Sequence, residues 1–494
     1  MKLTRYFLSG IAAVLMFASC SKDFLDTEYT NYLSAEEAGI AAAKNPDVFL
    51  NGMWSFMVEY QGYHDCFGLL STVLSTDFMT EDIAMAASHW FSYDYELDNR
   101  MYNYRRPTQD WNLFYTLIAK ANEIIGGFPN GAQTEAQRAL LGQALAIRGM
   151  SYSYLIQIFQ NPYDANTNIR KDAPGVPIIL CLADGFTLDE LDSFKGRNTV
   201  ADVIDRAEKD LVAAVENLSQ ANFKRSSKNY VDLSVAYGFL ARHYLMSQQW
   251  AKAAEAAQNA HKDYTIMDKN GLHDGFLTCN NVEWMWGFAH NTETQTAYAS
   301  FSSHMANNGV GYAGLDYCAK LIDARLYNQI PDTDYRKELF NGPEGSTTQK
   351  TAAANRPYAA LKFGHVSDWS AHYVYMRASE MVLIEAEALV RQNKSTEAAT
   401  ALKKLMEKRD PAWRKSSTTL DEILLQRRIE LWGEGFGYFD LKRNSLGIDR
   451  NYAGNNHLPG YAKTVPAQSP LWTYQIPNQE MQENSHLDAS DQNE

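Results

Sequence analysis

Apolar residues recur at three- and four-residue spacing in seven segments of the chain, a period that places them on one face of an α-helix. These segments cover residues 35–59, 109–127, 133–160, 200–218, 231–262, 375–408 and 421–434. Alternating strand patterns are few and short. The sequence therefore predicts a mostly α-helical protein with a few short strands.

Residues 231–262 have the small and large side chains that two antiparallel helices of a tetratricopeptide-type pair need where they touch. The residues predicted to meet are Tyr237, Leu240, Ala241 and Tyr244 on the first helix and Trp250, Ala253 and Ala260 on the second. A weaker copy of this pattern covers residues 381–406. A generic pair of antiparallel helices is the alternative for both copies. Stacked pairs of this kind form a rigid scaffold.

Two stretches, at about 61–108 and 264–373, differ from the rest of the chain. They are crowded with Trp, Tyr, Phe, Gly, Asn and Ser and show little periodicity. Long loops inside a compact chain usually carry function. We expect these stretches to be loop-rich excursions of one domain at 35–494 and to carry its binding surface.

The N-terminus is typical of an export signal. Lys2 and Arg5 precede an apolar run at residues 7–18 that is too short to span a bilayer as a mature helix. The run ends in Phe-Ala-Ser before Cys20, a pattern that a lipoprotein signal peptidase cleaves. We expect residues 1–19 to be removed, Cys20 to be acylated and residues 20–34 to form a tether. Ordinary secretory cleavage near Ala18 is the alternative.

The composition and net charge limit the classes of molecule that the protein is expected to bind. Hydrophobic residues make up 45% of the chain and the net charge is −14, and loss of the basic residues 1–19 makes the mature chain more negative still. That balance argues against nucleic acid or anionic lipid as a partner. The remaining cysteines, Cys66, Cys181, Cys279 and Cys318, match no metal spacing. Export permits disulfides, but small buried thiols are the favoured interpretation.

Catalytic motifs give no support for an enzyme. The sequence has neither His-Glu-x-x-His nor Gly-x-Ser-x-Gly. Gly309, Gly311 and Gly314 have dinucleotide-loop spacing, but a polar segment precedes them where a buried strand should be. We therefore expect a loop there, no cofactor and no metal.

Acidic pairs are the remaining candidates for catalysis, because two carboxylates can hydrolyse a glycosidic bond. Glu81 with Asp82 and Glu385 with Glu387 are such pairs, and with 59 acids in the chain close pairs arise by chance. We expect these four to be solvated or ion-paired.

Charged residues also gather in two constellations that look specific. Arg377, Glu380 and Glu387 are placed on neighbouring turns of one predicted helix, and residues 427–443 bring opposite charges on another. Such clusters lock helices together by charge-assisted hydrogen bonds. Their apolar neighbours favour a structural network over a catalytic site.

Five stretches together carry a resemblance to a known family. They are Cys-Ser-Lys-Asp-Phe-Leu-Asp at 20–26, residues 111–125, residues 377–388, residues 430–443 and Ile-Pro-x-x-Glu-x-x-x-Asn at 476–484. The sequence here resembles the SusD/RagB family, nutrient-binding lipoproteins of the Bacteroidetes outer membrane. Two positions depart from the family pattern: Gln426 replaces a frequent Glu, and Gly437 a frequent Arg.

The resemblance implies about four tetratricopeptide-like helix pairs that pack against a TonB-dependent, SusC-like barrel transporter and close over it as a lid. Members of the family mostly bind glycans and some bind peptides, and no catalytic residues come with the resemblance. It therefore implies a cell-surface glycan-binding lipoprotein, anchored in the outer membrane by Cys20. Peptide capture is the alternative within the family, and a secreted glycosidase is the alternative outside it.

Aromatic and amide residues on the two excursions are the candidates for glycan contact, because flat rings stack on sugar faces and amides bind the hydroxyl rim. The predicted ligand-binding residues are Trp90, Tyr93, Trp286, Tyr298, Asn308, Tyr312 and Trp369. Some of these rings can instead belong to the core. In particular, Trp284 and Trp286 share a face if residues 282–288 form a strand, and both are then candidates for burial.

Overall fold

The computed structural model describes residues 46–494 of the chain. The predicted signal peptide at 1–19, the lipidation site Cys20, the tether at 20–34 and residues 35–45 lie outside the described residues. Among the residues from 46 onward, no helix is both long enough and apolar enough to cross a membrane.

Helices dominate the fold, as the periodicity predicts. The longer ones are α3 (Pro46–Val58), α4 (Leu69–Phe78), α6 (Arg105–Gly126), α7 (Glu135–Ile158), α9 (Val200–Ser219), α10 (Leu233–Met246), α11 (Trp250–His261), α16 (Ala378–Val390), α17 (Ser395–Met406) and α18 (Leu420–Glu430). Shorter helices are α5 (Ser92–Glu96), α8 (Leu188–Ser193), α12 (Lys269–Leu272), α13 (Phe301–Met305), α14 (Ala324–Asn328), α15 (Ala352–Asn355), α19 (Gly437–Arg443) and α20 (Asn478–Glu483).

Strands occur as three short antiparallel pairs in the described part of the chain. β1 (Ile83–Met85) pairs with β3 (Lys320–Ile322), β2 (Trp284–Phe288) with β4 (Tyr373–Arg377), and β5 (Ile448–Asp449) with β6 (Thr464–Val465). The first two pairs join segments far apart in the sequence. They therefore tie the loop-rich excursions to each other and to the helices.

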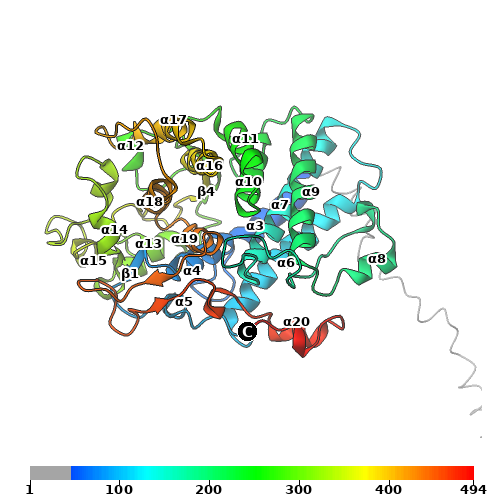
Figure 1. The fold of residues 1–494 in the computed structure, drawn as a ribbon, viewed down its shortest axis with the longest axis horizontal. Helices are drawn as coiled ribbons and strands as arrows, with labels where there is room; N and C mark the ends of the chain where they lie inside the picture. Colours follow the sequence, from blue (N-terminus) through cyan, green and yellow to red (C-terminus); the bar gives the residue numbers. More distant parts are fainter. Residues whose placement is uncertain (1–45) are drawn as a thin grey trace, which may run out of the picture.

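The helices pack on one another in a continuous stack. α6 packs on α7, α7 on α9, α10 on α11, α11 on α16 and α16 on α17. Figure 1 shows α10 and α11 standing between α7 and α9 on one side and α16 and α17 on the other. The predicted scaffold of helix pairs with long loops and few strands is confirmed.

Small residues let the helices of this scaffold approach closely. A Cβ atom added to Gly142 or Gly149 of α7 would lie 2.7 Å from a leucine of α9. In the pair α10 and α11, Ala241, Ala253 and Ala260 are fully buried, as the repeat pattern predicts. Caps fix the helix ends: the Thr134 side chain accepts a hydrogen bond from the Gln137 amide to begin α7.

Two segments differ from the sequence prediction. All ten residues of α4 are buried, although residues 61–108 were expected to be irregular. The apolar residues of α4 keep helical spacing, and the hydroxyls of Ser71, Ser75 and Thr76 donate to backbone carbonyls three residues earlier, which allows these polar side chains to be buried. The predicted helical segment at 375–408 begins as a strand, because residues up to Arg377 belong to β4; the helices α16 and α17 then follow, as the weaker copy of the pair pattern at 381–406 predicts.

Candidate functional site

Four of the predicted ligand-binding residues meet on the loop-rich excursions. The ring of Tyr312 lies 6.1 Å from that of Trp90 and 5.5 Å from that of Tyr298, and Tyr298 lies 5.0 Å from Trp369. These residues come from four loops that are distant in the sequence. We call this group, together with His64, the aromatic cluster.

His64 lies at the centre of the cluster and was not predicted from the sequence. Its Nδ1 atom is 2.6 Å from the Tyr312 hydroxyl, and its ring lies 5.6 Å from Trp90 and 6.3 Å from Tyr298. The signal that could have found it is the run Tyr60-Gln-Gly-Tyr63-His64, where several rings follow the end of a helix. The ring of Tyr60 lies 5.9 Å from the His64 ring, on the side away from the four predicted rings, and is not part of the cluster as defined here.

The rings of the cluster are open to solvent on part of their surface. Tyr298 is 46% exposed, and Trp90, Tyr312, His64 and Trp369 are half-buried. A half-buried ring is held by its neighbours on one side and presents its other side. The cluster therefore forms a part-exposed aromatic surface whose rings are mostly tilted to one another.

A buried ion pair holds the loop that carries His64. Arg106, at the start of α6, donates to Asp65 at 2.9 Å and to Asp94 of α5 at 3.0 Å. Burial raises the pKa of Asp65, but Arg106 and Arg105 outweigh it and lower that pKa to about 2. Asp65 therefore stays charged, and the bridge fixes the loop of His64 relative to the segment of Trp90.

Backbone strain marks the loops of the cluster. Trp369 has φ of 65°, Ala297 before Tyr298 has 49°, and Phe91 after Trp90 has 67°. A side chain in this left-handed region costs about 1–2 kcal/mol. Such strain persists where the surrounding structure holds it and is concentrated at binding sites. It here orients three rings of one cluster.

Histidine nitrogens around the cluster lack partners within the described chain. They are Nδ1 of His89, Nδ1 of His304 and both ring nitrogens of His365. His304 stacks on Tyr312 at 5.2 Å, and its Nε2 donates to the His64 carbonyl, so its Nδ1 is an acceptor. Burial, helped by Lys320, lowers the pKa of His304 to about 3. His304 is fully buried, so its neutral imidazole supports Tyr312 from below and does not face a ligand.

Tyr93 and Asn308 lie apart from the rings. Tyr93 is 63% exposed on α5 and makes no ring contact with the cluster among the described residues. The Asn308 amide donates to Gln349 at 3.0 Å and accepts from the Lys350 amide at 3.1 Å, so it holds a neighbouring loop in place. A ligand role for these two stays a prediction.

Trp286 is a core residue, which corrects its inclusion among the predicted ligand-binding residues. It is 1% exposed, and its Nε1 donates to the Asn229 carbonyl at 2.8 Å. Its ring contacts Trp54 at 6.1 Å and Phe239 at 4.9 Å. β2 is covered on both faces, so Trp284 is buried with it. A ring enclosed in this way cannot stack on a ligand.

The glycine motif at 309–314 serves packing. A Cβ atom at Gly314 would lie 1.9 Å from the Gly309 carbonyl oxygen, and one at Gly311 would lie 2.4 Å from Ser303. The segment forms a short 3-10 turn, Tyr312–Gly314, after α13 rather than a phosphate loop after a strand. Its close packing supports Tyr312 in the aromatic cluster.

The charged constellations form a buried network, as predicted. Arg377 donates to Glu434 at 2.8 Å, to Glu283 at 2.5 Å and to Glu430 at 3.0 Å, and Arg409 bonds both Glu283 and Glu430. Burial raises the pKa of Glu430, but Arg409 and Arg377 outweigh it and lower that pKa well below its usual range. Arg377 belongs to β4 and not to α16, so the predicted single-helix placement is wrong.

The candidate catalytic carboxylates are also paired. Glu385 accepts from His261 at 2.8 Å, Glu387 pairs with Arg443, and Asp82 accepts from Arg428 at 2.5 Å. Glu81 accepts from Arg428 at 2.9 Å. The expectation that these four carboxylates are ion-paired is confirmed.

The thiols of Cys66, Cys181, Cys279 and Cys318 are free, and Cys181 alone of these is not fully buried.

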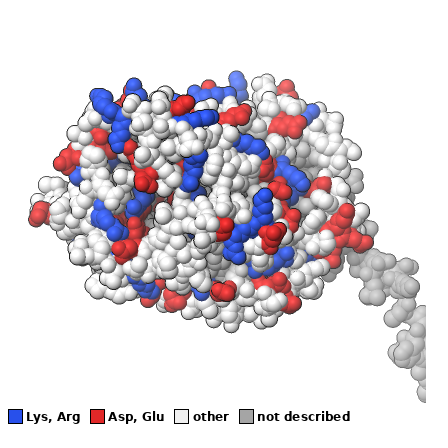
Figure 2. Space-filling view, in the orientation of Figure 1, with Lys and Arg blue, Asp and Glu red and all other residues white. Residues whose placement is uncertain are grey.

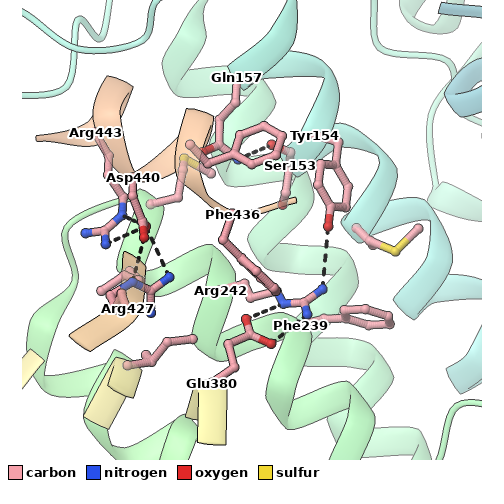
Figure 3. Close-up of a pocket in the computed structure, with 15 residues that line it drawn as sticks. Ser153, Tyr154, Gln157, Phe239, Arg242, Glu380, Arg427, Phe436, Asp440 and Arg443 are labelled. Atoms are coloured by element: carbon pink, nitrogen blue, oxygen red, sulfur yellow. Dashed lines mark hydrogen bonds and ion pairs between the residues drawn. The ribbon is translucent and has the colours of Figure 1, made fainter. Parts of the chain in front are cut away.

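A cavity of about 70 Å³ lies between helices of the scaffold, and Figure 3 shows the residues that line it. Its charged groups pair with one another: Arg242 donates to both oxygens of Glu380 at 2.7 Å, and Arg427 donates to Asp440 at 2.7 Å. Ligand pockets usually measure roughly 300–1,000 Å³. This cavity has room for a few water molecules only, and it is part of the scaffold.

Acidic and basic side chains are interspersed over the face of the molecule in Figure 2, and no large patch of one sign appears there. No group of three or more metal-ligating side chains occurs among the described residues. This face therefore offers no single-sign surface for steering a charged partner.

A stack of helix pairs with an aromatic surface on its loops defines a helical scaffold protein of the tetratricopeptide-like class. Comparison with known families identifies the class further. A family model described as "SusD family" matches residues 240–494, and one described as "Starch-binding associating with outer membrane" matches residues 23–245. The chain belongs to the SusD family, and the resemblance inferred from its sequence is confirmed.

Similar proteins span most of the chain. SusD-like protein P2 of Formosa agariphila is 24% identical over 388 residues, which cover 68% of this chain and 71% of that protein. A SusD-like carbohydrate binding protein of Bacteroides vulgatus has a TM-score of 0.78 at 24% identity and covers 92% of this chain and 98% of its own. A SusD superfamily protein of Bacteroides thetaiotaomicron has a TM-score of 0.74 at 22% identity, with coverage of 92% and 99%. These structures share the fold.

Proposed function

We propose that the chain is a cell-surface glycan-binding lipoprotein that passes oligosaccharides to a SusC-like, TonB-dependent transporter of the outer membrane. The aromatic cluster is the observation that carries the proposal. It combines part-exposed aromatic rings with the Tyr312 hydroxyl and the half-buried imidazole of His64. A sugar ring needs both, because its C–H faces stack on aromatic rings and its hydroxyls need hydrogen-bond partners.

The expected affinity is modest. Each ring that stacks contributes about 0.5–1.5 kcal/mol beyond its buried area. Three stacked rings therefore supply up to about 4 kcal/mol, which corresponds to millimolar dissociation constants. Several protein copies bound to one polymer would raise the apparent affinity. This regime suits a protein that must release its ligand to a transporter.

Family membership supports the type of ligand. One matching family model is described as starch-binding, and a similar solved structure is described as carbohydrate-binding. Neither description names a sugar for this chain. The aromatic cluster is the independent support, because Trp90, Tyr312 and Trp369 were selected from the sequence for glycan contact and lie together in the fold.

The anchor and the transporter follow from the sequence pattern and the family. Cys20 ends a lipoprotein signal pattern, and acylation there would hold the chain at the outer membrane. Cys20→Ala should move the protein from the membrane fraction to the soluble fraction, with loss of labelling by a palmitate analogue. Recovery of a barrel transporter with the wild-type protein from detergent-solubilised membranes would test the partner.

A glycan array followed by calorimetry tests the ligand. Trp369→Ala and Tyr312→Ala should each weaken binding of the best array ligand by about 3- to 10-fold, because each removes one stacking surface. Trp90→Ala should act in the same direction. Tyr102→Ala is the matched control, since Tyr102 is 41% exposed in the turn before α6, and its affinity should be unchanged.

The same experiment separates the competing functions. Binding of peptides in preference to every glycan would favour peptide capture. Shortening of the bound oligosaccharide, seen by mass spectrometry, would favour a glycosidase. If no glycan binds the wild-type protein, the proposed function is wrong.

A further inference from the structure

A groove of about 470 Å³ lies next to the aromatic cluster and has no role in the account above. The end of α3, the loop after it and the segment after β2 line this groove. The residues that matter for its chemistry are Ser55, Glu59, Tyr60, Glu293, Gln295 and Thr296. Its volume is within the range of ligand sites.

The groove continues the surface of the cluster. Tyr60 lines it, is 48% exposed and lies with its ring 5.9 Å from the His64 ring at the centre of the cluster. On the opposite side, Thr296 lines the groove two residues before Tyr298 of the cluster. A chain molecule stacked on the cluster can therefore extend over Tyr60 into the groove.

The chemistry of the groove suits a sugar unit. Tyr60 offers a ring face, and Ser55, Gln295 and Thr296 place hydroxyl and amide groups around it. This is the same combination of apolar face and polar rim that a pyranose requires.

The charge of the groove is one-sided. Glu59 and Glu293 are exposed, and neither forms an ion pair with the described residues. The described lining residues include no Lys, Arg or His. A second groove on the other side of the same loop differs, because its Arg105 is paired with Asp65 at 2.8 Å. Only the first groove therefore has uncompensated negative charge.

We propose that this groove, the Tyr60 groove, is a second sugar subsite that accepts neutral or amine-bearing units and rejects units that carry a carboxylate or a sulfate. The proposal rests on the proposed glycan-binding function and adds its selectivity. Two carboxylates within about 7 Å of an anionic sugar, in a medium close to water, should weaken binding by about 5- to 10-fold at low salt. The effect should shrink as salt rises, since exposed charges are screened.

Chain length tests whether the groove is occupied. The probes are a trimer and a hexamer of the best neutral array ligand. Wild-type protein should bind the hexamer about 5-fold more tightly than the trimer, and Tyr60→Ala should remove most of this gain while leaving the trimer affinity unchanged. Tyr102→Ala should keep the gain. Equal loss for both lengths, or no loss for either, would overturn the subsite.

Charge tests the selectivity. The probe is the same hexamer oxidised at its primary hydroxyls to carboxylates, compared with the neutral hexamer. The oxidised hexamer should bind wild-type protein about 5- to 10-fold more weakly than the neutral hexamer. In Glu59→Gln/Glu293→Gln this ratio of dissociation constants should fall to the part that is due to replacing the hydroxyls alone, without the charge repulsion. The control Glu216→Gln/Glu397→Gln changes the net charge equally on α9 and α17, where both residues are exposed, and should leave the ratio unaltered.

The outcomes distinguish the two levels of the proposal. If neutral and oxidised hexamers bind alike, or the double variant leaves their ratio unchanged, the selectivity is wrong while glycan binding stands. If no array glycan binds, the proposed function fails and the Tyr60 groove fails with it.

Discussion

The ion network around Arg377 and the aromatic cluster around His64 differ in burial and in the pairing of their polar groups. In the network, Arg377, Glu283 and Glu430 are fully buried, and each has charged partners. In the cluster, the rings are part-exposed, and the neighbouring His89, His304 and His365 have imidazole nitrogens without partners within the described chain. The ion network is therefore buried and its charges are paired, whereas the aromatic cluster is fixed by its neighbours and keeps part of its surface open.

The difference teaches where binding is expected in this fold. Buried charges must be paired, because desolvation makes an unpaired one very costly, so the network locks strand β4 to α18 and the segment after it. Polar atoms without partners and strained backbone at exposed rings are tolerated where a ligand or water can complete them. A search for shifted pKa values alone would select the buried ion network around Arg377, where every charge already has a partner.

The largest expected effect breaks the network. Arg377→Met leaves three carboxylates short of a partner and should destabilise the protein by about 3–5 kcal/mol. Urea denaturation followed by circular dichroism measures this. Arg356→Met, which removes an exposed bridge to Asp316, should cost about 1 kcal/mol or less. Equal effects of the two substitutions would contradict the contrast drawn between buried and exposed pairs.

The next effect separates two tryptophans that look alike in the sequence. Trp286→Ala should cost about 4 kcal/mol of stability, because it leaves a cavity in the core. Trp369→Ala should change stability by less than about 1 kcal/mol and weaken glycan binding instead. Thermal melts and calorimetry on both variants measure the two quantities. A stable Trp286→Ala protein that has lost glycan binding would reverse the correction made to the predicted site.

A smaller effect on stability is expected from the protonation of His304, which packs on Tyr312 of the aromatic cluster. Its folded pKa of about 3 is below the unfolded value of about 6.5, so its contribution to stability is present above pH 6.5 and is lost as pH falls. At about 1.4 kcal/mol per pH unit, wild-type protein should lose about 2 kcal/mol more than His304→Gln between pH 6.5 and 5. The exposed His273→Gln is the control in the same urea series. Parallel pH profiles for wild type and His304→Gln would show that His304 is not held neutral.

The smallest expected effect concerns Tyr93. Its exposed ring stands apart from the cluster, so Tyr93→Ala should weaken glycan binding by about twofold at most and leave stability within about 0.5 kcal/mol. Titration with the array ligand measures the affinity. A loss as large as that of Trp369→Ala would place Tyr93 in the binding surface.

The scaffold was largely predictable, because helical periodicity, caps and small residues at helix contacts are local features of the sequence. The pair at 231–262 was found from alanine and aromatic spacing alone, and its alanines are buried as predicted. α4 was missed because its helical spacing covers only ten residues inside a stretch whose composition is typical of loops. The ion-paired role of Glu387 was also predictable, since apolar neighbours surround it on a helix.

The sequence by itself determined the helices, the loop-rich excursions and the residue types suited to sugar faces, since these depend on neighbours in the chain. Only the tertiary structure decided which rings share a surface. Trp90 and Tyr312 meet at His64, and Tyr298 joins Trp369 to them, because the loops that carry these rings are tied together by β1–β3, β2–β4 and the Arg106 bridge. Trp286 became core for the same reason, because pairing with β4 and packing on Phe239 enclosed a ring that local sequence left open to either role.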